Sequence, residues 1–262
     1  MTGVTGELIF IGLGLWSEKD ITIAGAEAAG ECDVVFAEFY TSMLGVPKER
    51  MEDIIGGRIE VLSREEVEDG ERILGEAMDK KVCLLTGGDP MTATTHIDLR
   101  LRAIERGIAT RVVHGISIVT AASGLLGLQS YKFGRATTLA FPEGDYFPTS
   151  PYDVVSKNME MGLHTLVLLD VGNKFMTANE GIELLLEMEN REKRGIIGKK
   201  TLAAVVARAS SPSPTVRAGY PGELADMDFG PPLHCIVIPG KLHFMEAKAL
   251  VMLAGAPREI ME

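Results

Sequence analysis

Three short segments hold the residues that could bind a ligand, and Thr86-Gly87-Gly88-Asp89-Pro90 is the most informative of them. It follows an apolar run at 82–85 that predicts a buried strand, and it precedes Thr94 or Thr95, either of which can cap a helix. Ligands of open α/β sheets bind where strands end, and glycines let the backbone approach a ligand without a Cβ in the way. We therefore expect Asp89 to accept hydrogen bonds, either from a ligand or from local amides.

The second segment contains Gly12 and Gly14, after a predicted strand at 7–11. It imitates the dinucleotide-binding pattern G-x-G-x-x-G, but Ser17 stands where the third glycine should be, so we do not expect NAD to bind. A further strand closes a βαβ unit and ends near Glu38. That carboxylate could bind a ribose, or it could be a solvated acid at the end of a strand.

The third segment, His114-Gly115-Ile116-Ser117, follows a predicted strand at 111–113 and precedes an apolar helix at 118–126. Ser117 is a natural N-cap, so backbone amides at this helix start could receive an anion, although a purely structural cap fits equally well. With the other two segments, three successive strand ends carry glycine turns. We expect one edge of the sheet to bind the ligand.

Apolar patterns predict the elements that position these loops. Ile97, Leu101 and Ile104 are expected to form the buried side of a helix that stops at Gly107. The other elements expected in this half are a helix capped by Asp20 and ending near Ala29, strands at 33–37 and 58–62, and a helix from a capping box of Ser63 and Glu66 to about Asp79.

A polar, interrupted stretch at 128–135 marks a domain boundary, which we place after residue 130. Beyond it the pattern starts again and predicts at least five strands. They are expected at 137–141, 164–170, 201–207, 216–220 and 234–239, with helices at 150–161, from a capping box of Thr177 and Glu180, and at 242–253. The fold class is therefore α/β, in two domains at 1–130 and 131–262.

Composition excludes several classes of protein. The chain has 262 residues and a formal net charge of -11, which argues against nucleic acid as a partner because phosphate binding needs clustered Lys and Arg. Cys32, Cys83 and Cys235 suggest neither a disulfide framework nor a metal site, so no metal is predicted. The first residues lack the basic flank of a signal peptide, and no run approaches the ~18 apolar residues of a membrane span. We expect a cytoplasmic protein.

The three segments together resemble the tetrapyrrole methylase superfamily, the class III methyltransferases. The resemblance rests on IGLGL at 11–15, LLTGGDP at 84–90 and HGISIVTAA at 114–122. Longer strings, such as FAEFYTS at 36–42, FPEGDYFPTS at 141–150 and SPTVRAGY at 213–220, are similar to one branch of it that acts on translation elongation factor 2. Two departures are visible, because Gly87 and His114 both stand where relatives often have Pro.

The resemblance implies a homodimer of two-domain chains, with S-adenosylmethionine between the N-terminal domain and a C-terminal domain that completes the cofactor and acceptor cleft. On the residues alone, Asp89→Ala is expected to weaken cofactor binding and to leave the fold intact. His234, without the resemblance, is more often a packed histidine than a ligand contact. The cofactor contacts that the resemblance implies are Leu15, Asp89, Thr92, Ser117, Ile118, Leu169, Ala209 and His234.

The implied reaction is repeated N-methylation in diphthamide biosynthesis, with S-adenosylhomocysteine as product. The acceptor would be the amino group of a 3-amino-3-carboxypropyl chain on a histidine of elongation factor 2. Methyl transfer from a sulfonium mainly requires alignment and exclusion of water, and the sequence identifies no catalytic base. Two alternatives stay open: a methyltransferase for a corrin or porphyrin precursor, to which an acidic chain is poorly suited, and a non-catalytic nucleotide-binding module using Gly12, Gly14 and Glu38.

Overall fold

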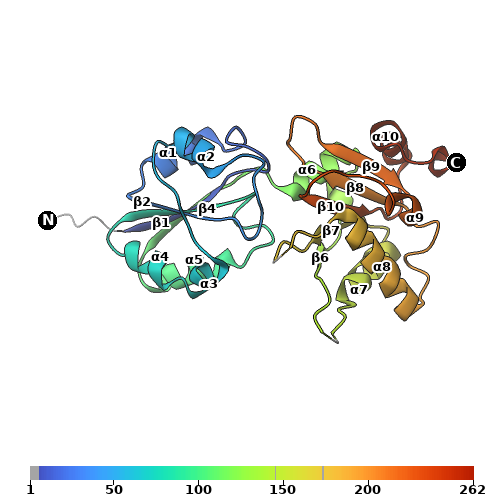
Figure 1. The fold of residues 1–262 in the computed structure, drawn as a ribbon, viewed down its shortest axis with the longest axis horizontal. Coiled ribbons are helices and arrows are strands. Elements are labelled where there is room, and N and C mark those ends of the chain that lie inside the picture. The colour runs from blue at the N-terminus through green and yellow to red at the C-terminus, as the bar shows by residue number, and fades with distance from the viewer. Residues whose placement is uncertain (1–5, 145, 173) are drawn as a thin grey trace. The chain divides into compact units, whose positions relative to one another are not determined.

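The computed structural model describes residues 6–144, 146–172 and 174–262, so Asp145 of the segment at 141–150 and the first residues of the chain lie outside it. The chain forms two compact units, Met1–Ile118 and Val119–Glu262 (Figure 1). This division falls earlier in the chain than the boundary expected after residue 130, because all but the first residue of helix α6 (Ile118–Leu126) belongs to the second unit.

The first unit contains a parallel sheet with the strand order β3-β2-β4-β1-β5. Its strands are buried on both faces at the centre, which explains their near-continuous apolar sequences. The carboxyl ends of β1, β4 and β5 lie at one edge of the sheet, as the three glycine turns predicted. The strands are β1 (Glu7–Gly12), β2 (Val34–Glu38), β3 (Glu60–Val61), β4 (Lys81–Thr86) and β5 (Ala109–Val113).

Helices cover both faces of this sheet. Helices α1 (Ile23–Gly30) and α2 (Lys48–Ile55) lie on one face, and α3 (Arg64–Asp69), α4 (Glu71–Glu76) and α5 (His96–Glu105) on the other (Figure 1). Alternate residues of β1 enter the two resulting cores, Ile9 and Ile11 on the first face and Leu8 and Phe10 on the second.

Two helix boundaries differ from the prediction. Thr22, not Asp20, caps α1 by accepting the Gly25 amide at 3.0 Å, while Asp20 accepts the Trp16 amide at 2.7 Å inside the preceding turn. The helix expected from Ser63 to about residue 79 is two helices, because Gly70 takes a left-handed conformation with φ of 68° and ends α3. The capping box at Ser63 is confirmed.

The buried side of α5 was predicted wrongly. Ile97, Leu101 and Ile104 are 53%, 53% and 52% exposed, whereas Leu99 and Ala103 enter the core. The buried stripe begins with His96, which is 1% exposed, and a pattern that counts apolar residues passes over a buried histidine.

The second unit holds a mixed sheet with the strand order β6-β7-β10-β8-β9, in which β6 and β7 are parallel and the other pairs antiparallel. The five expected strands are confirmed. They are β6 (Thr137–Leu139), β7 (Thr165–Leu169), β8 (Ala203–Ala207), β9 (Thr215–Gly219) and β10 (His234–Ile238), with helices α7 (Ser150–Glu160), α8 (Ala178–Glu192), α9 (Pro221–Leu224) and α10 (Phe244–Ala254).

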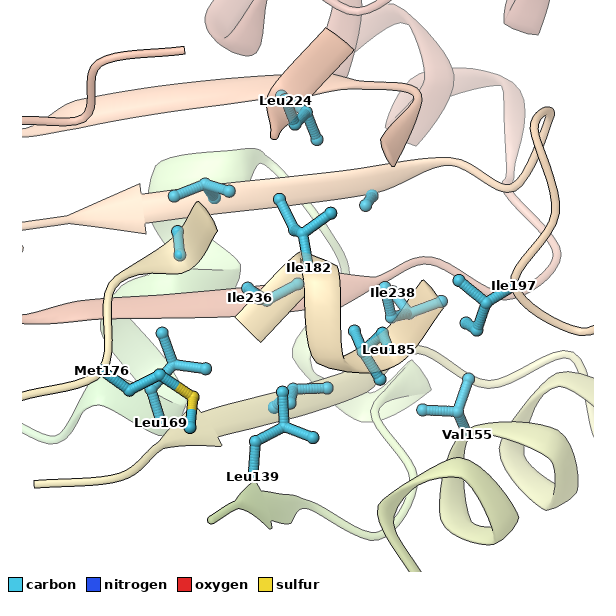
Figure 2. Close-up of a cluster of buried hydrophobic side chains, with 14 of the residues drawn as sticks. Leu139, Val155, Leu169, Met176, Ile182, Leu185, Ile197, Leu224, Ile236 and Ile238 are labelled. Atoms are coloured by element: carbon cyan, nitrogen blue, oxygen red, sulfur yellow. The ribbon is translucent and has the colours of Figure 1, made fainter. Parts of the chain in front are cut away.

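The core of this unit lies where α8 packs on the sheet. Figure 2 shows Ile182 and Leu185 of α8 among Leu139, Leu169 and Ile236 of three strands. The predicted capping box of Thr177 and Glu180 is confirmed at the start of α8. Within the described ranges, no helix has both the length and the apolar composition that crossing a membrane requires.

Helix α10 is attached to the start of the second unit by a buried carboxylate. Glu246 is 1% exposed and accepts hydrogen bonds from Nε2 of His164 at 3.0 Å, the Gln129 amide at 2.9 Å and the His243 amide at 2.8 Å. Lys132 completes the network with an ion pair to the same carboxylate. Residues far apart in the sequence are therefore held together by one side chain.

Candidate functional site

The ends of β1, β4 and β5 and the loops that follow them contain Gly12 and Gly14, Gly87 and Gly88, and Gly115, and are called the glycine loops. Their backbones pack directly against one another. Gly14 donates to the Gly88 carbonyl at 3.2 Å, and Gly88 donates to the Gly14 carbonyl at 2.6 Å. A Cβ on Gly12 would lie 2.5 Å from the Gly88 oxygen and 2.6 Å from the Gly115 nitrogen, and a Cβ on Gly115 would overlap that same oxygen. These glycines are required because the loops approach one another so closely.

Gly87 and Gly88 have different roles. A Cβ on Gly87 would lie 2.7 Å from Cβ of Ser42, so the loop after β2 occupies that space and no ligand can. A Cβ on Gly88 would meet nothing nearer than Leu15 at 3.9 Å and the Ile116 oxygen at 4.0 Å. Of the two glycines in the turn, Gly88 is therefore the one that leaves room for a ligand.

Asp89 joins the loop after β4 to the loop after β5. It accepts hydrogen bonds from the Met91 amide at 3.0 Å, the Thr92 hydroxyl at 3.3 Å and Nδ1 of His114 at 2.7 Å. Burial alone would raise the pKa of Asp89, but the bonds from Met91 and His114 outweigh it and lower that pKa, so the side chain is ionised at neutral pH. Sequence analysis missed the partnership with His114, whose one signal was a histidine where relatives often have Pro.

We expect Asp89→Asn to reduce the affinity for S-adenosylhomocysteine by about tenfold, through loss of a charge-assisted bond. Asparagine keeps the shape of the turn, whereas alanine would not. The reason is that the Asp89 side chain bonds to both Met91 and His114, which is more contact than the sequence suggested. Calorimetric titration measures the affinity, and circular dichroism controls for folding. Unchanged affinity would assign Asp89 a purely structural role.

The remaining candidates of the first unit lie at the same edge of its sheet. Leu15 and Thr92 are half-buried in the loops after β1 and β4, and Ser117 and Ile118 are half-buried where α6 begins. The open space at Gly88, an apolar side chain at Leu15 and an ionised carboxylate at Asp89 suit a ligand that is part apolar ring and part cation, as S-adenosylmethionine is.

The candidates of the second unit gather at one edge of its sheet. Leu169 ends β7 and Ala209 follows β8, while His234 begins β10, which runs antiparallel between them. His234 accepts the Ala178 amide on Nδ1 at 3.1 Å and donates to the Pro231 carbonyl from Nε2 at 3.0 Å. Burial lowers the pKa of His234, so the ring is neutral and positions the start of α8.

Glu38 is not the solvated acid that was one expectation. It is fully buried and accepts the Thr41 amide at 3.1 Å together with the Thr41 hydroxyl. Burial raises the pKa of Glu38 more than these bonds lower it. A buried carboxylate with a raised pKa at the edge where the glycine turns meet is a candidate for proton chemistry.

A separate hollow of about 280 Å³ lies between α3 and the start of α5. None of the eight candidate cofactor residues contributes to its wall, so it is not the site built by the glycine loops. It is lined by Val67, Glu68, Thr95, His96, Asp98 and Leu99.

Comparison with known proteins gives consistent matches along nearly the whole chain. The family described as Tetrapyrrole (Corrin/Porphyrin) Methylases matches residues 7–225. Diphthine synthases of Methanocella arvoryzae and Methanosarcina acetivorans are 52% and 49% identical, covering 95% and 97% of this chain and 98% of each relative. A crystal structure of diphthine synthase superimposes with a TM-score of 0.90 at 39% identity, over 97% of this chain and 98% of that one.

Proposed function

The chain belongs to the family of tetrapyrrole (corrin/porphyrin) methylases, and from this premise we propose that it carries out the diphthine synthase reaction. It is a methyltransferase that uses S-adenosylmethionine. The acceptor is the amino group of the 3-amino-3-carboxypropyl histidine of elongation factor 2, which is methylated repeatedly. The observation that carries this proposal is identity near 50% to diphthine synthases over almost the full length of both chains.

The rival substrate within the family is an anionic tetrapyrrole. The net charge of -11 disfavours an anionic macrocycle, whereas an acidic chain tolerates an amine that becomes a fixed cation. We place the reaction in the cytoplasm because the proposed substrate is a translation factor. The three cysteines are free thiols, as a reducing compartment permits.

The residues of the glycine loops would hold the cofactor by shape and charge. When bound, S-adenosylmethionine supplies a methyl group already activated on a sulfonium. Asp89 is ionised and would attract a nearby cation, and Leu15 would offer an apolar surface to the adenine. Gly88 has no side chain and would let the ligand approach the backbone. We propose Thr92, Ser117, Ile118, Leu169, Ala209 and His234 as the further contacts, and residues 36–42 and 141–150 as the acceptor side.

Mass spectrometry of elongation factor 2 tests the substrate directly. The factor is incubated with the protein and S-adenosylmethionine, once with its histidine carrying the aminocarboxypropyl group and once without it. We expect methyl groups to appear on the modified form alone. Equal labelling of both forms, or labelling only of a tetrapyrrole, would refute the assignment, and binding of the cofactor with no transfer to any acceptor would favour the non-catalytic module.

We expect a homodimer in solution. Helix α10 buries Ala247 and Leu250, but Phe244, Met252 and Leu253 on the same helix are 71%, 74% and 56% exposed. Exposed apolar side chains of this size on one helix are typical of a surface that a second chain covers. Light scattering at micromolar concentration measures the mass, and a value near the 28.3 kDa of one chain would contradict the prediction.

A further inference from the structure

A buried polar cluster lies in the first unit, in a layer that is otherwise apolar. Glu38 at the end of β2 and Thr86 at the end of β4 are paired in the parallel register, so their side chains leave the sheet on the same face. His96 stacks on Phe10 on that face, with 6.4 Å between ring centroids. Glu38 and Thr86 are 0% exposed and His96 is 1% exposed.

Two polar atoms of this cluster have no hydrogen-bond partner, Nε2 of His96 and Oγ1 of Thr86. Nδ1 of His96 lies 3.0 Å from the Pro90 carbonyl oxygen, which can only accept, so Nδ1 carries the hydrogen. In the neutral ring, Nε2 is then a lone pair, 3.9 Å from Oε1 of Glu38. A lone pair facing a carboxylate in an apolar layer is unfavourable, so uptake of one proton between them is favoured.

Thr41 connects this buried pair to the ligand edge. Its amide and its hydroxyl both donate to Glu38, and its side chain is half-buried rather than enclosed. The next residue, Ser42, fills the space beside Gly87 in the loop after β4. The carboxylate is therefore one hydrogen bond away from a residue at the edge where the glycine loops meet.

We propose that Glu38 and His96 act as one proton acceptor for the amine that is methylated, with the Thr41 hydroxyl as the link. This inference rests on the proposed function. The amine must lose a proton before its lone pair forms the N–C bond, while the S–C bond breaks and its electrons stay on sulfur. That proton passes to the Thr41 oxygen as the hydroxyl hydrogen passes to Glu38, and the resulting acid faces the lone pair of His96 Nε2, 3.9 Å away. After product release the proton returns to solvent by the same path.

The surrounding charges are consistent with this role. Burial raises the pKa of Glu38 and lowers the pKa of His96, so a proton that enters the pair stays on the carboxyl group. Burial, followed by the charge of Glu38, raises the pKa of Tyr40 to about 12, so the phenol does not compete for the proton. The charged groups that face the pair or line the adjoining hollow are Arg64, Glu68 and Asp98.

Glu38→Gln tests the proposal, because glutamine keeps an oxygen for the Thr41 amide but cannot take up a proton. We expect the rate of methyl transfer to fall roughly 10²- to 10⁴-fold, and the rise of that rate with pH to disappear. Affinity for S-adenosylhomocysteine should be unchanged. The matched control is Glu52→Gln in the same unit, where the carboxylate accepts the Ile59 amide at 2.9 Å and an ion pair from Lys48, and its rate profile should match the wild type.

A wild-type rate in Glu38→Gln, or a lower rate with the same dependence on pH, would overturn the proposal. A second measurement needs no substrate: the NMR titration of the His96 ring in the wild type and in Glu38→Gln. If Glu38 and His96 share a proton, replacing Glu38 changes the pH titration of the His96 ring. Identical titration curves in the two proteins would refute the proposed pair. If the wild type transfers no methyl group to elongation factor 2, the proposed function fails, and the titration still decides whether the pair shares a proton.

Discussion

Replacing Glu246 with glutamine should lower the free energy of unfolding by about 3 kcal/mol, the scale on which removing one partner of a buried ion pair destabilises proteins. The carboxylate is 1% exposed and is bonded to Lys132 and His164. Nδ1 of His164 accepts the Gly240 amide at 3.0 Å, so Nε2 carries the hydrogen and donates to Glu246. The amide nitrogen of glutamine is a hydrogen-bond donor, and it would face Lys132 or His164, which are donors as well.

The same carboxylate should make stability depend on pH in the acid range. Burial would raise the pKa of Glu246, but bonds from Lys132 and from the His243 and Gln129 amides lower it to about 2, against 4.5 for the unperturbed group. A lowered pKa contributes stability above pH 4.5, and this contribution is lost as pH falls from 4.5 toward 2. The difference corresponds to about 3 kcal/mol.

Urea denaturation at pH 7 and at several points between pH 5 and pH 2 measures both effects. The control is Glu180→Gln. Glu246 and Glu180 both belong to capping boxes, with His243 at the start of α10 and with Thr177 at the start of α8, but the Glu180 side chain is 28% exposed and pairs with Lys174. Its variant should lose less than about 1 kcal/mol. Equal losses in the two variants, or an acid dependence in Glu246→Gln as large as that of the wild type, would contradict the role assigned to Glu246.

Gly115→Ala should weaken cofactor binding strongly. The added Cβ would overlap the Gly88 oxygen and lie 2.8 Å from the Gly12 Cα, and all of these atoms are backbone that cannot swing aside. The loops after β1, β4 and β5 must then separate, at a cost of about 1 to 3 kcal/mol in stability. Movement of that kind should lower the affinity for S-adenosylhomocysteine at least about tenfold, a change of 1.4 kcal/mol.

Gly75→Ala is the matched control for this substitution. Gly75 lies in α4 of the same unit, and a Cβ there would meet nothing within 4 Å. Alanine in the last turn of this helix should leave binding unchanged and raise stability by less than about 1 kcal/mol. Calorimetry and urea denaturation compare the two variants, and wild-type affinity in Gly115→Ala would show that close packing of the loops is not needed for binding.

Elements with strong local signals could be predicted from the sequence. The strands of both sheets, the capping boxes at Ser63 and Thr177 and the helix α6 depend on residues a few positions apart, so a local pattern contains the information. Helices α2 and α9 were not predicted; α2 lacks a side-chain cap and α9 spans only Pro221–Leu224. The glycine turns were predicted to lie at one edge of the sheet, and the structure confirms this arrangement in the first unit. Ligand binding at that edge stays a prediction.

Contacts between distant residues were decided by the tertiary structure alone. The sequence pattern predicted that Ile97, Leu101 and Ile104 form the buried face of α5, whereas the core includes the face with His96. It offered a ribose ligand or a solvated acid at Glu38, and burial beside His96 made that carboxylate a candidate proton acceptor. Asp89 and His114 lie 25 positions apart, and only the parallel sheet brings them within a hydrogen bond. The sequence determines the type of each side chain and its local spacing. The burial, charge state and partners of a side chain depend on which distant strands become neighbours in one sheet, so only the tertiary structure decides them.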